Sequence, residues 1–130
     1  MTNPNIVNVS AIYGTTTYYT PSGTTAVVLV PNASGSNTVL KINQIVVSNT
    51  TGSAANATVS IYTNGAVAQG SAPAGGTAYP VVSAVSVPAN ASLIAVDKTT
   101  AIYLQEGTSI SITSGTANAL TFSISYEAIS

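Results

Sequence analysis

The chain has 130 residues, and only 4% of them are charged: two cationic and three anionic side chains, with neither histidine nor cysteine. An average domain carries about 25% charged residues. Two lysines cannot make a phosphate-binding face, which argues against a nucleic-acid partner, and the missing thiols exclude disulfides and cysteine-metal sites.

The length fits a single domain spanning residues 1–130, large enough to bury its own core. No apolar run approaches the roughly 20 residues that cross a bilayer. Residues 1–5 show neither the basic nor the apolar part of a secretory signal. We therefore expect one domain, without a membrane partner and without a signal peptide.

The first part of the chain alternates short apolar runs with turn residues. Tyr13-Gly14 and Pro21-Ser22-Gly23 predict turns that separate strands at roughly 6–12, 16–20 and 24–30. Tyr18 and Tyr19 are adjacent on the second of these strands, so one should face inward and the other outward.

A phase switch marks the next strand, at roughly 38–48. Leu40 and Ile42 share one face of a regular strand, whereas Ile45 and Val47 share the other. A β-bulge at Asn43-Gln44 would bring all four to the same side. A strand buried on both faces is the alternative, but it would bury two amide side chains.

The strand at roughly 56–63 places Val59 and Ile61 on its apolar face and Tyr62 on its polar, exposed face. The segment 65–78 that follows contains almost only small residues. It is long for a connection in a compact domain, and such loops tend to be functional or mobile. We expect its truncation to spare folding and to weaken assembly.

The rest of the chain keeps a period of two. Leu120, Phe122, Ile124 and Tyr126 alternate with polar residues. The later strands are expected at roughly 78–87, 92–97, 100–105 with 108–113, and 119–129. The predicted fold class is all-β, a β-sandwich or jelly roll of about eight to nine short antiparallel strands.

The titratable residues offer little chemistry. Nucleophilic catalysis needs a base beside the nucleophile, and Lys41 and Lys98 are the only amines, without a motif around them. The only carboxylates are scattered, without an Asp-x-Asp run for calcium, and are expected to be solvated at strand ends and edges. They are Asp97, Glu106 and Glu127. We expect no catalytic residue, no cofactor and no metal site, and hence a protein that is not an enzyme.

The low charge bears on association. Little repulsion keeps copies of the chain apart, which favours a surface covered by other copies or by partners. A surface rich in Thr and Asn that is simply well solvated is the alternative.

Five short segments, in the order in which they occur along the chain, are the basis of a family resemblance. They are YTPSGTTA (19–26), IVVSNTTGSAANATVSI (45–61), VSVPANAS (85–92), LQEGTSISI (104–112) and FSISYE (122–127). Over residues 13 to 129 the chain resembles small β-rich virion structural proteins of tailed bacteriophages, especially of cyanophages and marine phages. That loose group includes head decoration, or cement, proteins and small tail-associated parts. None of the segments is a functional-site motif, so no site residue carries over.

The resemblance implies a structural virion protein on the outer surface of the capsid, where it would bind the major capsid protein and brace neighbouring subunits. It also implies threefold clustering, and therefore a homotrimer. A tail, neck or fibre component is the alternative of the same class. A glycan-binding adhesin module, using Tyr62, Tyr79 or loop asparagines, is the alternative of a different class.

Overall fold

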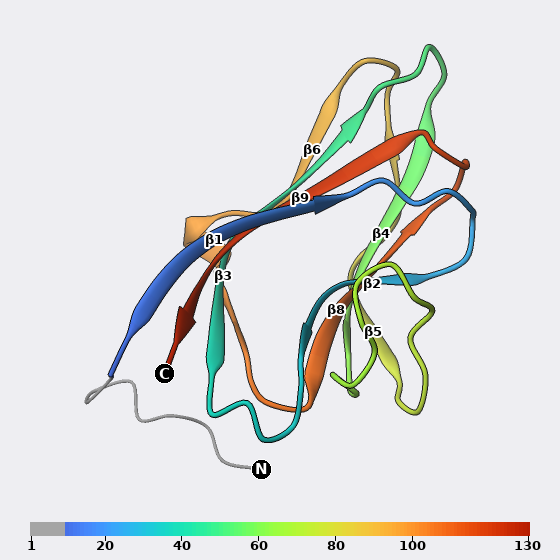
Figure 1. The fold of residues 1–130 in the computed structure, drawn as a ribbon. Coiled ribbons are helices and arrows are strands. Elements are labelled where there is room, and N and C mark those ends of the chain that lie inside the picture. Colours follow the sequence, from blue (N-terminus) through green and yellow to red (C-terminus); the bar gives the residue numbers. More distant parts are fainter. Residues whose placement is uncertain (1–9) are drawn as a thin grey trace.

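The computed structural model describes residues 10–130, which form two antiparallel sheets packed face to face (Figure 1). Sheet A has the strand order β1-β9-β3-β6, with β7 also paired to β3, and sheet B has the order β2-β8-β4-β5. The strands are β1 (Ile12–Tyr19), β2 (Val27–Asn32), β3 (Val39–Asn49), β4 (Ala55–Tyr62), β5 (Ala78–Val87), β6 (Ser92–Val96), β7 (Ile102–Leu104), β8 (Thr108–Ser114) and β9 (Leu120–Ile129), with a 3-10 turn, η1 (Lys98–Thr100), between β6 and β7. The all-β sandwich expected from the sequence is confirmed.

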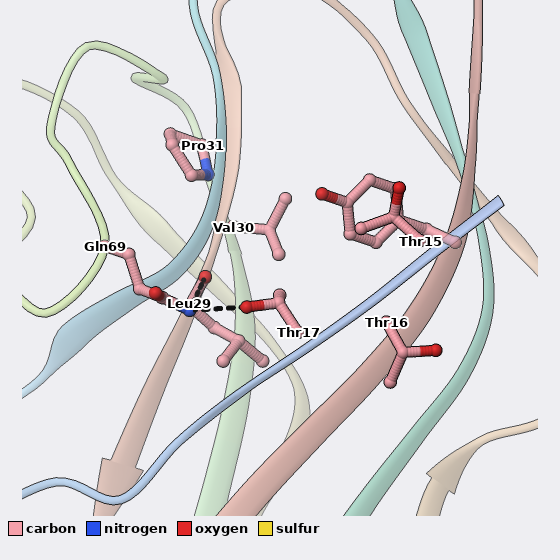
Figure 2. A pocket seen from close by; sticks show the side chains of 8 residues that line it. Thr15, Thr16, Thr17, Leu29, Val30, Pro31 and Gln69 are labelled. Carbon is pink, nitrogen blue, oxygen red and sulfur yellow. Dashed lines mark hydrogen bonds between the residues drawn. The ribbon is translucent and has the colours of Figure 1, made fainter. Parts of the chain in front are cut away.

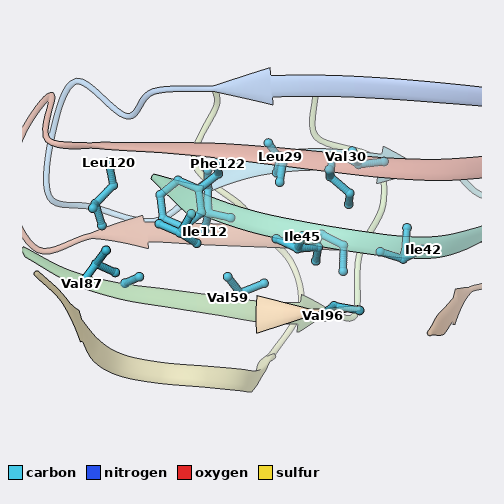
Figure 3. Close-up of a cluster of buried hydrophobic side chains, with 14 of the residues drawn as sticks. Leu29, Val30, Ile42, Ile45, Val59, Val87, Val96, Ile112, Leu120 and Phe122 are labelled. Carbon is cyan, nitrogen blue, oxygen red and sulfur yellow. The ribbon is translucent and has the colours of Figure 1, made fainter. Parts of the chain in front are cut away.

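The core is the layer of aliphatic and aromatic side chains between the two sheets (Figure 3). Phe122 and Ile45 enter it from sheet A, and Ile112 and Val59 enter it from sheet B; all four are fully or almost fully buried. Each of these residues sits in the apolar phase of an alternating strand, so the period of two in the sequence is the period of the buried face.

The β-bulge expected in β3 is present. The register between β3 and β9 shifts between Ile42 and Gln44, which leaves Asn43 without an opposing residue. Leu40, Ile42, Ile45 and Val47 are consequently all buried. The extra residue shifts the alternation of the second half of the strand by one residue, so the apolar side chains of both halves point into the core.

The turn predicted at Tyr13-Gly14 is wrong, because both residues lie inside β1. Their strand runs alongside β9 without a break in register, and Gly14 pairs with Glu127. Cross-strand pairing with β9 overrides the local preference of glycine for a turn. Of the strand expected at 6–12, residues 6–9 lie outside the described part.

The other strands begin and end within three residues of the predicted bounds. The stretch 100–105 with 108–113 divides between the sheets: β7 pairs with β3 in sheet A, and β8 pairs with β2 and β4 in sheet B.

The small-residue segment 63–77 covers part of the outer face of sheet B and the free edge of β2. The amide of Gly70 donates to the Val28 carbonyl, and the Val28 amide donates to the Ser71 carbonyl, at 2.8 and 2.9 Å. Ser109, a β8 residue that is fully buried, donates its hydroxyl to the Asn64 carbonyl. The segment is therefore hydrogen-bonded to both β2 and β8, contacts that its small residues did not indicate in the sequence.

Tyr62 is buried beneath this segment, whereas the sequence pattern predicted an exposed side chain. Its hydroxyl donates to the carbonyl of Gly76 and accepts from the Gly76 amide, at 3.0 and 3.1 Å. Tyr62 does lie on the polar phase of β4, but that phase faces the covering segment and not solvent.

This arrangement predicts that Gly65→Ala destabilises the protein although it adds a single methyl group. The new Cβ would overlap the main-chain carbonyl oxygens of Asn32 and Thr108. We expect a loss of about 1–3 kcal/mol in the free energy of unfolding, as for other overpacked sites. Urea denaturation followed by circular dichroism measures it. The matched control is Gly52→Ala, where nothing lies within 4 Å of the added atom. Equal, small effects of the two substitutions would show that segment 63–77 does not hold the position described.

Candidate functional site

Four of the five charged residues lie at the surface of sheet A or at its 3-10 turn. Lys41 and Glu127 are opposite one another in the register of β3 and β9. Asp97 and Lys98 are adjacent at the start of η1 and line a shallow hollow beside the β3 bulge, together with Asn43 and Gln44. Within residues 10–130 no three acidic, histidine or cysteine side chains gather closely enough to hold a metal ion.

Asp97 has a local structural role. Its carboxylate accepts hydrogen bonds from the amide and the hydroxyl of Thr99, which caps the 3-10 turn. These bonds from Thr99 hold the pKa of the carboxyl below its usual value, since they favour the charged form.

Glu106 differs from the sequence expectation of a solvated acid, because only 1% of its surface is exposed. Its Oε1 accepts a hydrogen bond of 2.7 Å from the amide of Gly35. The turn between β2 and β3 is thereby attached to the crossing from β7 to β8. A buried carboxylate that accepts from main-chain amides is a loop anchor, a role that the surrounding Gln-Glu-Gly pattern did not distinguish from a solvated turn.

An open groove of about 460 Å³ lies between the β1 edge of sheet A and the β2 edge of sheet B (Figure 2). Thr15 and Thr17 line it from β1, Tyr126 lines it from β9, and Gln69 reaches in from segment 63–77. The Gln69 amide donates to the Thr17 hydroxyl at 3.2 Å and to the Leu29 carbonyl at 3.0 Å, so one side chain connects the two sheets. Burial raises the pKa of the Tyr126 phenol above its usual value.

The outer face of sheet A is the larger candidate surface. Cross-strand register aligns hydroxyl side chains across it, and Thr16 and Ser125 are hydrogen-bonded at 2.9 Å. Tyr18 on β1, Ile94 on β6 and Tyr103 on β7 project from the same face with 70%, 60% and 54% of their surfaces exposed. Such a face offers hydroxyl groups and large side chains, together with the Lys41–Glu127 pair, which lies beside Tyr103 in the register.

The two tyrosines singled out for glycan contact lie in different environments. Tyr62 is buried under segment 63–77, whereas Tyr79 is exposed on β5, the edge strand of sheet B. The structure therefore does not bring them together as one binding surface. The sequence pattern also gave no signal for Gln69 in the groove, because a lone glutamine in a run of small residues has no periodicity.

Among residues 10–130 no helix is long and apolar enough to cross a membrane. No protein-family model matches the chain, and no curated protein sequence matches it significantly. The class that the structure defines is thus an all-β sandwich protein.

The dispersed acids predict that stability is independent of divalent cations. We expect the melting temperature to be the same with and without an excess of chelator, because no described group of carboxylates converges on one point. Differential scanning calorimetry measures this. A drop of several degrees in chelator, reversed by calcium, would reveal a site built from main-chain and amide oxygens.

Proposed function

We propose that this chain is a non-enzymatic structural protein of a virus particle that decorates the outer surface of the capsid and braces neighbouring capsid subunits. Two things support the proposal: the resemblance to small β-rich virion proteins of tailed phages, and the outer face of sheet A. The resemblance is the reason for proposing a location on a virus particle and threefold clustering there. The face supplies the chemistry of contact.

The outer face of sheet A is the observation that carries the proposal. A protein that braces a shell binds by area and shape, and interface centres are enriched in aromatic side chains. Tyr18, Ile94 and Tyr103 provide three large anchors on one face. The Ser and Thr hydroxyls between them can donate to or accept from main-chain groups of a partner.

A tail, neck or fibre part would use the same face in the same way, and only its location in the particle would differ. The groove between β1 and β2 favours a second candidate function, glycan binding. Its lining combines Thr hydroxyls, the Gln69 amide and the Tyr126 ring, which are groups that can contact a sugar.

The direct test is binding to virus particles of the phage that encodes the chain. We expect the purified protein to co-sediment with heads and not with tails. Tyr103→Ser should weaken head binding about tenfold or more, the loss typical of a buried aromatic anchor. The matched control is Tyr79→Ser, which removes a similarly exposed tyrosine from the opposite sheet.

Each other outcome has a definite meaning. Binding to tails alone would overturn the head location. Unchanged head binding by the Tyr103 variant would remove the outer face of sheet A as the contact surface. Glycan-array binding that requires Gln69, without any particle binding, would replace the proposal by the second candidate.

A further inference from the structure

Within residues 10–130, the strand at one edge of sheet A lacks the features that keep edges of β-sheets from pairing with other chains. Natural edge strands are blunted by charge, proline, bulges, short length or a covering segment. β1 has eight residues, none of them charged or proline, and its register with β9 is unbroken. Among the described residues no strand pairs with its other edge.

Every other edge in the described part of the chain has at least one such feature. β2 contains Pro31 and is hydrogen-bonded by segment 63–77. β5 contains Pro80, shifts register twice against β4, and has Ala84 at a positive φ of 49°. β6 and β7 are only five and three residues long, and the register of β6 shifts against β3. The open edge of β1 is therefore specific to that strand.

The hydrogen-bond pattern shows which groups of β1 face outward. Ala11 and Ser130 exchange two main-chain hydrogen bonds, of 3.0 and 2.9 Å, at the start of the ladder. In an antiparallel ladder such pairs alternate, so the odd-numbered residues of β1 bond to β9. The amides and carbonyls of Ile12, Gly14, Thr16 and Tyr18 consequently point to the open edge.

We propose that β1 pairs with β1 of a second copy of the chain, antiparallel, about a twofold axis at Thr15. Outward-facing groups must meet each other, so an even-numbered residue of one copy must oppose an even-numbered residue of the other. Among the registers that satisfy this, centring on Thr15 is the one that pairs all four outward-facing residues of β1, from Ile12 to Tyr18. Gly14 then opposes Thr16 of the second copy, and Thr15 opposes Thr15.

The side chains in this register are complementary to themselves. Ile12 of one copy lies opposite Tyr18 of the other, so two side chains that are 55% and 70% exposed cover each other. Pairs of an aromatic and a β-branched side chain are favourable across strands. β1 carries no charge, so like charges of the two copies do not meet. The two sheets A become one continuous sheet across the axis.

A twofold contact closes on itself after two copies. It therefore yields a dimer, and a trimer of the kind implied by the phage resemblance would need a different surface. The contact follows from the edge of β1 alone, so it does not depend on attachment to a capsid.

Introduced cysteines test the register directly, because the natural chain has no cysteine. Thr15 would form a pair without main-chain hydrogen bonds at the axis, where Cα atoms are about 4.5 Å apart, within the range of a disulfide. We expect Thr15→Cys to form a covalent dimer under mild oxidation. Tyr13→Cys and Thr17→Cys should each stay uncross-linked alone, because identical residues are then far from the axis. The two variants mixed should cross-link, since residues 13 and 17 oppose each other.

Association in solution provides the second measurement. Analytical ultracentrifugation of the unmodified chain should show a dimer whose dissociation constant is nearly independent of salt, because screening acts on charges. Thr16→Lys should weaken dimerisation at least tenfold, since it adds a charge at the paired edge. Ser92→Lys adds the same charge to the same face at the opposite edge and should leave dimerisation unchanged.

A chain that stays monomeric at every concentration, with no cross-linking of Thr15→Cys, would overturn the proposal. Preferential cross-linking of Thr17→Cys alone would overturn the register. Dimers that resist Thr16→Lys but dissociate with Ser92→Lys would assign the contact to β6.

Discussion

The sandwich depends on one irregular residue in its most connected strand. β3 pairs with β9, β6 and β7, and it contributes four side chains to the core. Without the bulge between Ile42 and Gln44, half of these side chains would turn from the core to the opposite face of the sheet. The bulge also leaves Asn43 and Gln44 at the surface, beside Asp97 and Lys98, where their amides remain solvated. Core packing and the shape of the outer face of sheet A are thus set at the same position.

Amide side chains and main-chain groups hold the loops in place. The chain has few charged residues that could do this through ion pairs. Asn32 donates to the carbonyls of Thr38 and Leu104, and Asn49 donates to those of Ser53 and Val87. Both asparagines are buried at strand ends, where a fully satisfied amide avoids the desolvation cost of an ion pair. Gln69 connects the two sheets by the same chemistry. The surface is therefore left with little charge, a condition that favours close contact between copies.

The strands and the bulge could be predicted because both follow from alternation, a local property of the sequence. What could not be predicted depends on contacts between distant segments. From the sequence Gly14 is predicted to be a turn residue, but in the structure it pairs with β9. Tyr62 is predicted to be exposed, but segment 63–77 covers it. Glu106 reads as a solvated acid until the Gly35 amide reaches its carboxylate. Gln69 and segment 63–77 had no pattern at all, because small residues specify neither strand nor helix. The candidate surfaces were accordingly much less accessible to sequence reasoning than the fold.

The open edge of β1 connects the fold to assembly, and amide hydrogen exchange in solution tests it most directly. In an isolated chain the amides of Thr15 and Thr17 are protected by β9, whereas those of Gly14 and Thr16 face solvent and exchange fast. The account predicts that raising the protein concentration slows exchange at Gly14 and Thr16 and leaves Thr15 and Thr17 unchanged. Exchange at Gly14 and Thr16 that stays fast at every concentration, while the protein associates, would show that the copies meet elsewhere and would contradict the account.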